Sequence, residues 1–323
     1  MSIPNPLDEA STREAVNYFR AAGFDQVDTA IMYQGGKSEV TLGNVGMDSI
    51  RVAAKANPWY KDGKTFDDPV GGLNAGSVKE QLRASLASLR CDAQSSVDLF
   101  YLHAPDHDTP IEETLRAVHE LRSDGLFREW GLSNYAAWQA VDIWHMCKAN
   151  GWQTPSVYQG MYNAVTREVE RELLPALNRL GMRFYAYNPL AGGILTGKHR
   201  FDSPPDGGRF STRTVWGGRY RQASAKNAAR THEPVFEALD VLRDLCEKHN
   251  TTLVSASLRW LKHHSALSAG ERGDAVIVCG SSLAQVKANV DACADDTPLP
   301  QELVEGFDSA WVVSRAQCPQ YFR

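Results

Sequence analysis

The chain has 323 residues, of which 43% are hydrophobic and 23% charged, and this balance is typical of a folded globular protein rather than a disordered or fibrous one. Its formal net charge is −5 and it has no block of five like charges, which argues against nucleic-acid or anionic-lipid partners. No 18 consecutive apolar residues and no signal-peptide pattern occur, so we expect no membrane span and a cytoplasmic location. The six cysteines are scattered without a Cys-x-x-Cys pair and are expected to be reduced thiols.

Short strand-like apolar runs alternate with amphipathic helical stretches along the chain. The predicted strands cover residues 24–29, 51–55, 97–103, 129–133, 156–159, 183–188 and 274–279. The predicted helices cover residues 9–22, 77–89, 111–124, 136–148, 168–180, 234–249, 253–264 and 283–292. This alternation predicts a parallel sheet joined by right-handed helical crossovers.

The architecture that fits this pattern is an α/β fold of the (β/α)8 TIM-barrel type, forming a single domain over residues 1–323. A doubly wound open sheet is less consistent, because no Gly-x-Gly-x-x-Gly lies between an early strand and helix. The first barrel strand is missing or truncated, since residues 1–7 are short and contain Pro4 and Pro6, so we expect an incompletely closed barrel. Residues 198–230, rich in Gly, Arg and Ser, are expected to form a lid-like loop.

Polar residues follow three of the predicted strands, at the barrel end where catalytic groups gather. Asp28 closes one strand and is followed by Tyr33, Lys55 closes the next, and His103 closes the third. Asp28 could serve as the counter-ion of Lys55, and that cation would make the Tyr33 phenol a stronger acid. His103 could polarise a carbonyl group, so the four residues together predict a proton-donor site that lacks only a source of hydride.

These residues resemble, in order and spacing, the catalytic tetrad of the aldo-keto reductase superfamily. Other matching segments extend along nearly the whole chain, namely Gly131 to Tyr135, Tyr158 to Asn163, Tyr187 to Gly193, Gly280 to Leu283 with Asn289, and the C-terminal Cys318 to Arg323. Together they are most similar to the branch that contains aflatoxin-aldehyde and succinic-semialdehyde reductases. The resemblance implies an oxidoreductase that reduces an aldehyde or ketone to an alcohol with NADPH, bound in an extended form and without a Rossmann domain.

The resemblance also implies roles for individual residues. Tyr33 would donate the proton, and Asp28 and Lys55 would tune the pKa of its phenol. His103 would assist carbonyl binding. The cofactor-binding residues that it implies are Asp28, Ser133, Asn134, Gln159, Asn188, Pro189, Leu190, Gly192, Gly193, Lys198, Arg209, Ser281, Ser282, Gln285 and Asn289. Tyr33, His103, Tyr220 and Arg323 would contact the substrate, and no metal is implied.

Two alternatives stay open at this point. A nucleotide-binding regulatory subunit of the same fold would have the same sequence pattern with weak catalysis. A metal-dependent barrel hydrolase is a weaker alternative, indicated by His103, Asp106, His107 and Asp108 clustered after one strand. The expected partner is a small carbonyl compound, which would be the substrate. The sequence is compatible with a homodimer but does not determine the oligomeric state.

Overall fold

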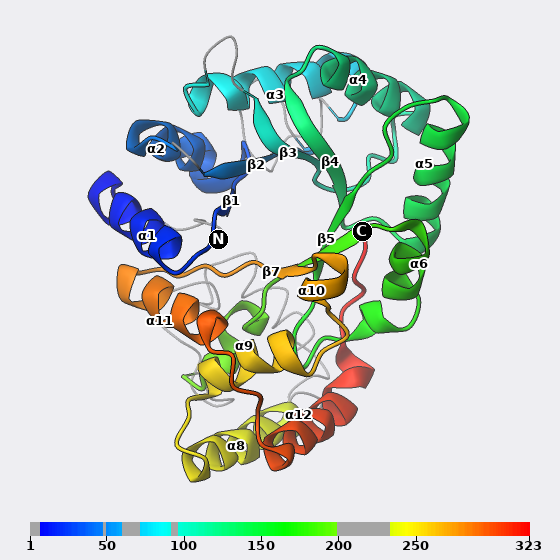
Figure 1. Cartoon of the computed structure of the whole chain (residues 1–323). Helices are drawn as coiled ribbons and strands as arrows, with labels where there is room; N and C mark the ends of the chain where they lie inside the picture. The colour runs from blue at the N-terminus through cyan, green and yellow to red at the C-terminus, as the bar shows by residue number, and fades with distance from the viewer. Residues whose placement is uncertain (1–6, 48–49, 60–71, 92–95, 199–232) are drawn as a thin grey trace.

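The computed structural model describes residues 7–47, 50–59, 72–91, 96–198 and 233–323. Seven parallel strands form one sheet in chain order, and the sheet curls into an open barrel with helices around it (Figure 1). The strands are β1 (Gln26–Asp28), β2 (Arg51–Ala56), β3 (Val97–Leu102), β4 (Phe127–Ser133), β5 (Val157–Met161), β6 (Arg183–Tyr187) and β7 (Ala275–Val276). The predicted α/β barrel with seven visible strands is therefore confirmed.

The helices alternate with these strands and lie on the outside of the curl (Figure 1). They are α1 (Glu9–Ala21), α2 (Lys37–Val45), α3 (Ala75–Ser88), α4 (Ile111–Ser123), α5 (Ala137–Ala149), α6 (Leu173–Leu180), α8 (Glu233–Lys248), α9 (Leu253–His263), α10 (Ala269–Arg272), α11 (Leu283–Ala294) and α12 (Gln301–Ser314). Short 3-10 turns are η1 (Tyr33–Gly36), η2 (Glu168–Glu170), η3 (Ala191–Thr196) and η5 (Arg315–Gln317).

The strands are buried on both faces because helices cover the outside and side chains fill the inside. In β3, Leu99 and Tyr101 point into the small interior cluster, whereas Phe100 and Leu102 belong to the larger core between sheet and helices. Ala53, Val157, Tyr185 and Ile277 complete the interior cluster. The alternation along β3 thus fixes which residues point into the barrel.

Several boundaries differ from those predicted. The helix expected over residues 168–180 is divided into η2 and the shorter α6, with Pro175 in the first turn of α6. The last strand is only Ala275–Val276, shorter than the predicted 274–279. Of the lid-like loop expected over residues 198–230, only Lys198 lies in the described part, and residues 1–6 also lie outside it.

The two outermost strands of the sheet, β1 and β7, do not pair with each other in the described part of the chain. The helices that flank them do meet, since α1 and α11 lie side by side (Figure 1). Tyr18 on α1 donates a hydrogen bond of 2.6 Å to Asp291 on α11, and Lys287 pairs with Glu14 at 2.7 Å. The ring of helices therefore continues past the gap in the sheet.

Candidate active site

The four residues predicted to carry the chemistry come from three neighbouring strands. Asp28 is the last residue of β1, Lys55 lies near the end of β2, and His103 directly follows β3. Tyr33 begins η1 shortly after β1. Because β1, β2 and β3 are adjacent and parallel, their carboxyl ends bring all four residues to the same end of the barrel.

Lys55 is the centre of this group. Its Nζ lies 2.6 Å from Asp28 Oδ2 and 2.7 Å from the carbonyl oxygen of Thr29, and the side chain is fully buried. The same Nζ is 5.0 Å from the centre of the Tyr33 ring. Burial lowers the pKa of Lys55, while the carboxylates of Asp28 and Glu39 act to raise it. The arrangement places a cation against the phenol that is predicted to donate the proton.

His103 lies beside Tyr33 with the two rings edge to face, 5.9 Å apart and at 74°. Burial holds its pKa well below the usual range, and the positive charges of Lys55 and Arg323 lower it further. The imidazole is therefore neutral at physiological pH. Its Nδ1 is buried and has no hydrogen-bond partner among the residues described, so a polar ligand at this nitrogen would satisfy an otherwise unpaired atom.

Three of the predicted cofactor-binding side chains adjoin the tetrad directly. Gln159 on β5 donates a hydrogen bond of 2.8 Å to Asp28, so it also completes the surroundings of that carboxylate. Ser133 is the last residue of β4, Asn134 follows it, and both are buried. Asn134 donates to the His103 carbonyl oxygen at 2.8 Å and to the Ser133 hydroxyl at 3.0 Å. These contacts hold the ends of β1, β3, β4 and β5 in a fixed relation.

The C-terminal residues dock at the same end of the barrel. The backbone N–H of Arg323 donates to the Asn134 carbonyl oxygen at 3.0 Å, and the Tyr321 hydroxyl accepts from the Ala137 N–H at 3.1 Å. The Arg323 guanidinium lies 5.1 Å from the centre of the Trp59 ring. The predicted substrate-contact residue Arg323 is thus close enough to act electrostatically on His103.

The segment after β6 is a tight turn rich in left-handed residues. Asn188, Ala191, Gly192 and Gly193 all have positive φ, at 56°, 50°, 70° and 120°. Two N–H groups of the turn bond within it, that of Ala191 to the Asn188 carbonyl oxygen at 2.9 Å and that of Gly193 to the Leu190 carbonyl oxygen at 2.8 Å. Pro189 in this turn is buried, whereas Leu190 is half-buried and Lys198 is exposed at its end.

The amino-terminal end of α11 brings together the last group of predicted cofactor residues. Ser282 caps the helix, accepting a hydrogen bond from the Gln285 N–H at 3.3 Å. The backbone N–H and hydroxyl of Ser281 both donate to Gln285 Oε1, at 2.9 and 2.8 Å. Asn289 is buried and donates to the Cys279 carbonyl oxygen at 2.8 Å. Ser281, Ser282 and Gln285 are exposed to a ligand, whereas Asn289 holds the loop that carries them.

Two predicted residues, Arg209 and Tyr220, lie outside the described residues. The proposed metal-ligand cluster after β3 has a different role where it is described, because Asp106 accepts backbone hydrogen bonds from Leu73 at 2.6 Å and from Asp108 at 3.0 Å. In the part of the chain that the structure describes, no three His, Cys, Asp or Glu side chains approach as metal ligands do. Within the same residues, no helix is long and apolar enough to cross a membrane.

Some members of the site were not predicted. Glu39 on α2 is fully buried and interacts electrostatically with Lys55. The Tyr187 hydroxyl donates to Asn134 Oδ1 at 2.7 Å. Gln159 was predicted, but its hydrogen bond to Asp28 was not. The sequence does contain a signal for the helix that carries Glu39. Ser38, Leu42 and Val45 have helical spacing, although two glycines precede them.

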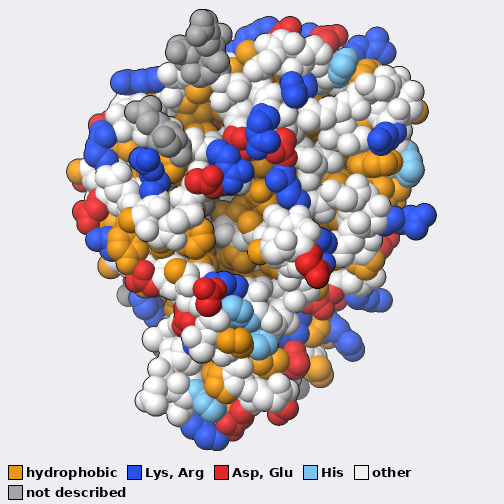
Figure 2. Space-filling model, in the orientation of Figure 1, with side chains coloured by type: hydrophobic (Ala, Val, Ile, Leu, Met, Phe, Trp, Pro, Cys, Tyr) orange, Lys and Arg blue, Asp and Glu red, His pale blue; other side chains and the backbone are white. Residues whose placement is uncertain are grey.

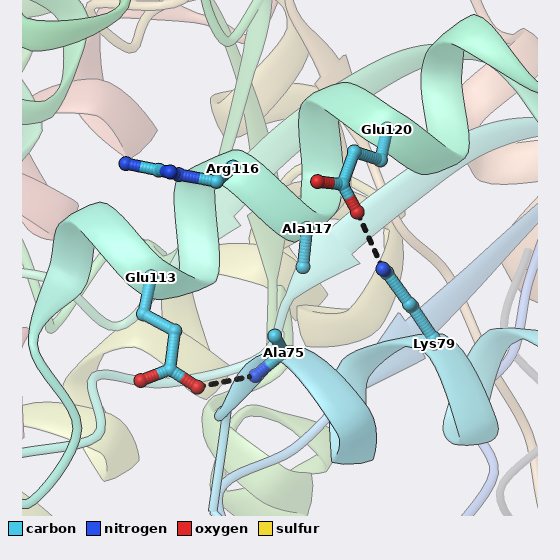
Figure 3. A pocket seen from close by; sticks show the side chains of 6 residues that line it. All are labelled: Ala75, Lys79, Glu113, Arg116, Ala117 and Glu120. Atoms are coloured by element: carbon cyan, nitrogen blue, oxygen red, sulfur yellow. Dashed lines mark hydrogen bonds and ion pairs between the residues drawn. The ribbon is translucent and has the colours of Figure 1, made fainter.

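A groove of about 320 Å³ lies elsewhere, on the outer face between α3 and α4 (Figure 3). It is lined by Ala75, Lys79, Glu113, Arg116, Ala117 and Glu120. Lys79 forms an ion pair with Glu120, and Glu113 accepts a hydrogen bond from the Ala75 N–H at 2.9 Å. The groove belongs to helices on the outside of the barrel, whereas the tetrad lies at the strand ends.

Comparisons with known proteins agree with this site. A family model described as "Aldo/keto reductase family" matches residues 1–312. Aflatoxin B1 aldehyde reductase member 2 from Mus musculus is 45% identical, with 100% of this chain and 86% of that protein covered. Aflatoxin B1 aldehyde reductase member 4 from Homo sapiens is 43% identical, with 100% of this chain and 95% of that protein covered. Among solved structures, a glycerol dehydrogenase from Gluconobacter oxydans matches with a TM-score of 0.71 over 95% of this chain and 86% of that one, at 21% identity, which shows the fold alone.

The barrel, the residues at its strand ends and these matches define an oxidoreductase that acts on carbonyl and alcohol groups. The chain belongs to the aldo/keto reductase family. The resemblance inferred from the motifs is therefore confirmed, including its similarity to the aflatoxin-aldehyde reductases.

Proposed function

We propose that this chain is an NADPH-dependent reductase that converts aldehydes or ketones to alcohols, with Tyr33 as the proton donor. The observation that carries the proposal is the position of the Lys55 ammonium, 2.6 Å from Asp28 and 5.0 Å from the centre of the Tyr33 ring. A buried cation at that place stabilises the phenolate that Tyr33 becomes when its proton leaves. Asp28 in turn acts against the burial that lowers the pKa of Lys55.

NADPH, when bound, would supply the hydride. The residues present fit it: Gly192 and Gly193 have no side chain to keep a pyrophosphate away from the backbone of their turn, and the exposed Ser281 and Ser282 at the start of α11 suit a further phosphate. Ser133, Asn134 and Gln159 would hold the nicotinamide carboxamide. The hydrogen bonds of Asn134 to the His103 carbonyl oxygen and to the Tyr187 hydroxyl hold it beside the tetrad.

The protein's own residues would then complete the reduction. Neutral His103 would donate a hydrogen bond from its imidazole to the carbonyl oxygen and so orient the substrate. Tyr33 would transfer its phenolic proton to that oxygen as the alcohol forms. The phenolate left on Tyr33 lies against Lys55 and is reprotonated from solvent after the product leaves.

The substrate class that we propose is a small aldehyde, by analogy with the relatives whose names state that they reduce aflatoxin B1 aldehyde. The Arg323 guanidinium beside Trp59 would attract a carboxylate on the same molecule. No disulfide joins any of the six cysteines, all of which lie in the described residues, and this supports a reducing compartment such as the cytoplasm.

The test is Tyr33→Phe, assayed with a panel of aldehydes. Removing a general acid costs about 10²–10⁴-fold in rate, so kcat should fall by that factor while NADPH binding stays near that of the wild type. Fluorescence titration of both proteins with NADPH and NADH measures the binding, and NADPH should bind more tightly.

Full turnover by Tyr33→Phe would refute the role of Tyr33. Equal affinities for NADPH and NADH would refute the assignment of the extra phosphate to Ser281 and Ser282. A wild-type chain that binds NADPH but reduces none of the aldehydes would instead be the regulatory subunit considered above.

A further inference from the structure

Glu39 is a buried carboxyl that the mechanism above does not use. It lies on α2, its side chain is fully buried, and neither of its carboxyl oxygens has a well-formed hydrogen bond among the residues described. An ionised carboxylate without partners in such a place is costly, and native proteins seldom keep one without a function. A role for this group therefore has to be sought in what surrounds it.

The packing of α2 determines which groups surround Glu39. Gly43 lies one helical turn further along the same face, and a Cβ there would come within 2.4 Å of the Ser88 carbonyl oxygen, so this face of α2 is packed tightly against α3. Ser85 lies one turn before Ser88, and its hydroxyl favours the charged form of Glu39. The start of α2 is tied to the end of β1, because the Ser38 and Thr29 hydroxyls are 3.0 Å apart. Glu39 is therefore enclosed between α2, α3 and the strands that carry the tetrad.

Of the charged groups on the elements around Glu39, Lys55 is the one that acts on it. Lys55 on β2 is connected to it through Thr29, whose carbonyl oxygen accepts from Lys55 Nζ at 2.7 Å and whose hydroxyl contacts that of Ser38, the residue before Glu39. The ammonium of Lys55 lowers the pKa of Glu39, and the carboxylate of Glu39 raises the pKa of Lys55. On α3 the group that acts is the uncharged Ser85, and on α1 Arg13 is bonded instead to the Val45 carbonyl oxygen at the other end of α2. Burial raises the pKa of Glu39 to about 7, against the smaller opposing effects of Ser85 and Lys55.

We propose that Glu39 is a positioning residue of the reaction site, whose carboxyl sets the charge balance around Lys55 and thereby how readily Tyr33 donates its proton. With Glu39 protonated, the Lys55 ammonium faces one carboxylate, Asp28, and the cluster is neutral. With Glu39 ionised, the cluster carries one negative charge, and a phenolate on Tyr33 would add a second. Loss of the proton from Tyr33 is then less favourable, so reduction slows as Glu39 ionises. The inference rests on the proposed function, because it acts through Tyr33.

The experiment is the pH profile of aldehyde reduction by the wild type, Glu39→Gln and Glu120→Gln. Between pH 6 and pH 8 the wild-type kcat should fall by up to about tenfold, the effect of one pKa unit on the proton donor. This fall in kcat is the falling limb of the pH profile. Glu39→Gln is neutral at every pH, so its profile should lack the falling limb. Glu120→Gln removes the same charge from the outer helix α4, where Glu120 pairs with Lys79, and should keep the wild-type profile (Figure 3).

A second variant tests the same site without altering the carboxyl. Ser85→Ala removes the hydroxyl that favours the charged form, so the falling limb should move to higher pH. Infrared difference spectra of the wild type should show a protonated carboxyl band that disappears between pH 6 and 8, and this band should be absent from Glu39→Gln.

The results separate this inference from the proposed function. A falling limb that persists unchanged in Glu39→Gln, or an infrared band that does not depend on Glu39, overturns the role of Glu39 even if Tyr33→Phe is inactive. Full turnover by Tyr33→Phe overturns the proposed function, while the infrared titration of Glu39 still reports whether its carboxyl ionises in this range.

Discussion

The Lys55–Asp28 pair carries a large desolvation cost, because both groups are taken out of water. It is offset by a short ion pair, by the hydrogen bond from Lys55 to the Thr29 carbonyl oxygen, and by the Gln159 amide on the second oxygen of Asp28. Two of the three Lys55 N–H donors and both Asp28 oxygens therefore have a specific partner. A buried pair arranged in this way contributes little to stability, and its value lies in holding a cation beside Tyr33.

The raised pKa of Glu39 also predicts how the stability of the folded protein depends on pH. Its pKa is raised from the model-compound value of 4.5 to about 7 in the folded state, so between these values the folded protein binds more protons than the unfolded chain. Stability conferred by the protonated carboxyl is full below pH 4.5 and is lost as the pH rises toward 7. The total change is about 3 kcal/mol, since each pKa unit corresponds to about 1.4 kcal/mol.

Urea unfolding of the wild type and Glu39→Gln at pH 5 and pH 7.5 measures this change. The stability of the wild type relative to Glu39→Gln should decrease by about 2.5 kcal/mol between these two pH values, most of the total change. Other titrating groups are common to both proteins and cancel in the difference. A difference that does not vary with pH would show that Glu39 ionises normally in the folded chain.

At the scale of single residues, the sequence was sufficient to predict which side chains at the ends of strands lie close together. Asp28, Lys55 and His103 could be predicted to converge because parallel strands end at one edge. Glu39 could not, because its contacts depend on how closely α2 packs against α3, which no local pattern specifies. The bond from Gln159 to Asp28 joins residues 131 positions apart, and sequence spacing contains no information on such a pair.

At the scale of elements, the apolar strands and most of the described helices were predicted, whereas α2, α10 and α12 were not. α2 follows two glycines and contains Gly43, so its formation depends on packing rather than on intrinsic preference. α12 was also missed, although Leu303, Phe307 and Ala310 have helical spacing. β7 is short because β6 is its single neighbour in the described sheet, and pairing there ends at Val276.

Gly131 on β4 is required by the close approach of neighbouring strands. A Cβ at this position would lie 2.4 Å from the Val157 carbonyl oxygen on β5 and 2.8 Å from the Tyr101 ring on β3. Backbone cannot move aside as a flexible side chain can, so Gly131→Ala should destabilise the protein by about 1–3 kcal/mol or more. Thermal unfolding monitored by circular dichroism measures the loss.

The matched control is Gly270→Ala on α10, where an added Cβ meets nothing within 4 Å. Its melting temperature should equal or slightly exceed that of the wild type, because alanine is the better helix former. If Gly131→Ala melts at the same temperature as Gly270→Ala, the close approach of Val157 and Tyr101 to Gly131 does not restrict this position.

At the scale of the whole molecule, the two ends of the barrel differ in their chemistry. Ion pairs join the amino-terminal parts of the strands, where Arg51 and Arg128 both pair with Asp98, and Arg183 pairs with Glu129. Charged side chains also gather around the hollow in the middle of the face seen in Figure 2. The carboxyl ends instead hold Asp28, Lys55 and His103, with Tyr33 shortly after β1. This division is typical of TIM barrels, in which residues at the amino-terminal end of the strands stabilise the fold and residues at the carboxyl end carry out catalysis.

The gap between β1 and β7 gives the last prediction. Each of these strands pairs on one side only in the described sheet, and the packing of α1 against α11 bridges the gap outside it. Backbone groups at such an edge are unsatisfied unless water or another segment reaches them, at about 1–3 kcal/mol for each one that is buried. A strand-forming segment of about five residues fused before Asp8 should pair there and complete the ring.

We expect this fusion to raise the melting temperature by several degrees, because each kcal/mol is worth about 2–4 °C in a chain of this general size. It should also raise the rate of NADPH-dependent aldehyde reduction, since the new strand would adjoin Asp28 at the end of β1. A Gly/Ser extension of equal length is the control, because it cannot supply a regular ladder of hydrogen bonds or an apolar inner face. If both extensions leave melting temperature and rate at the wild-type values, the helices alone close this barrel and the edges of β1 and β7 need no partner.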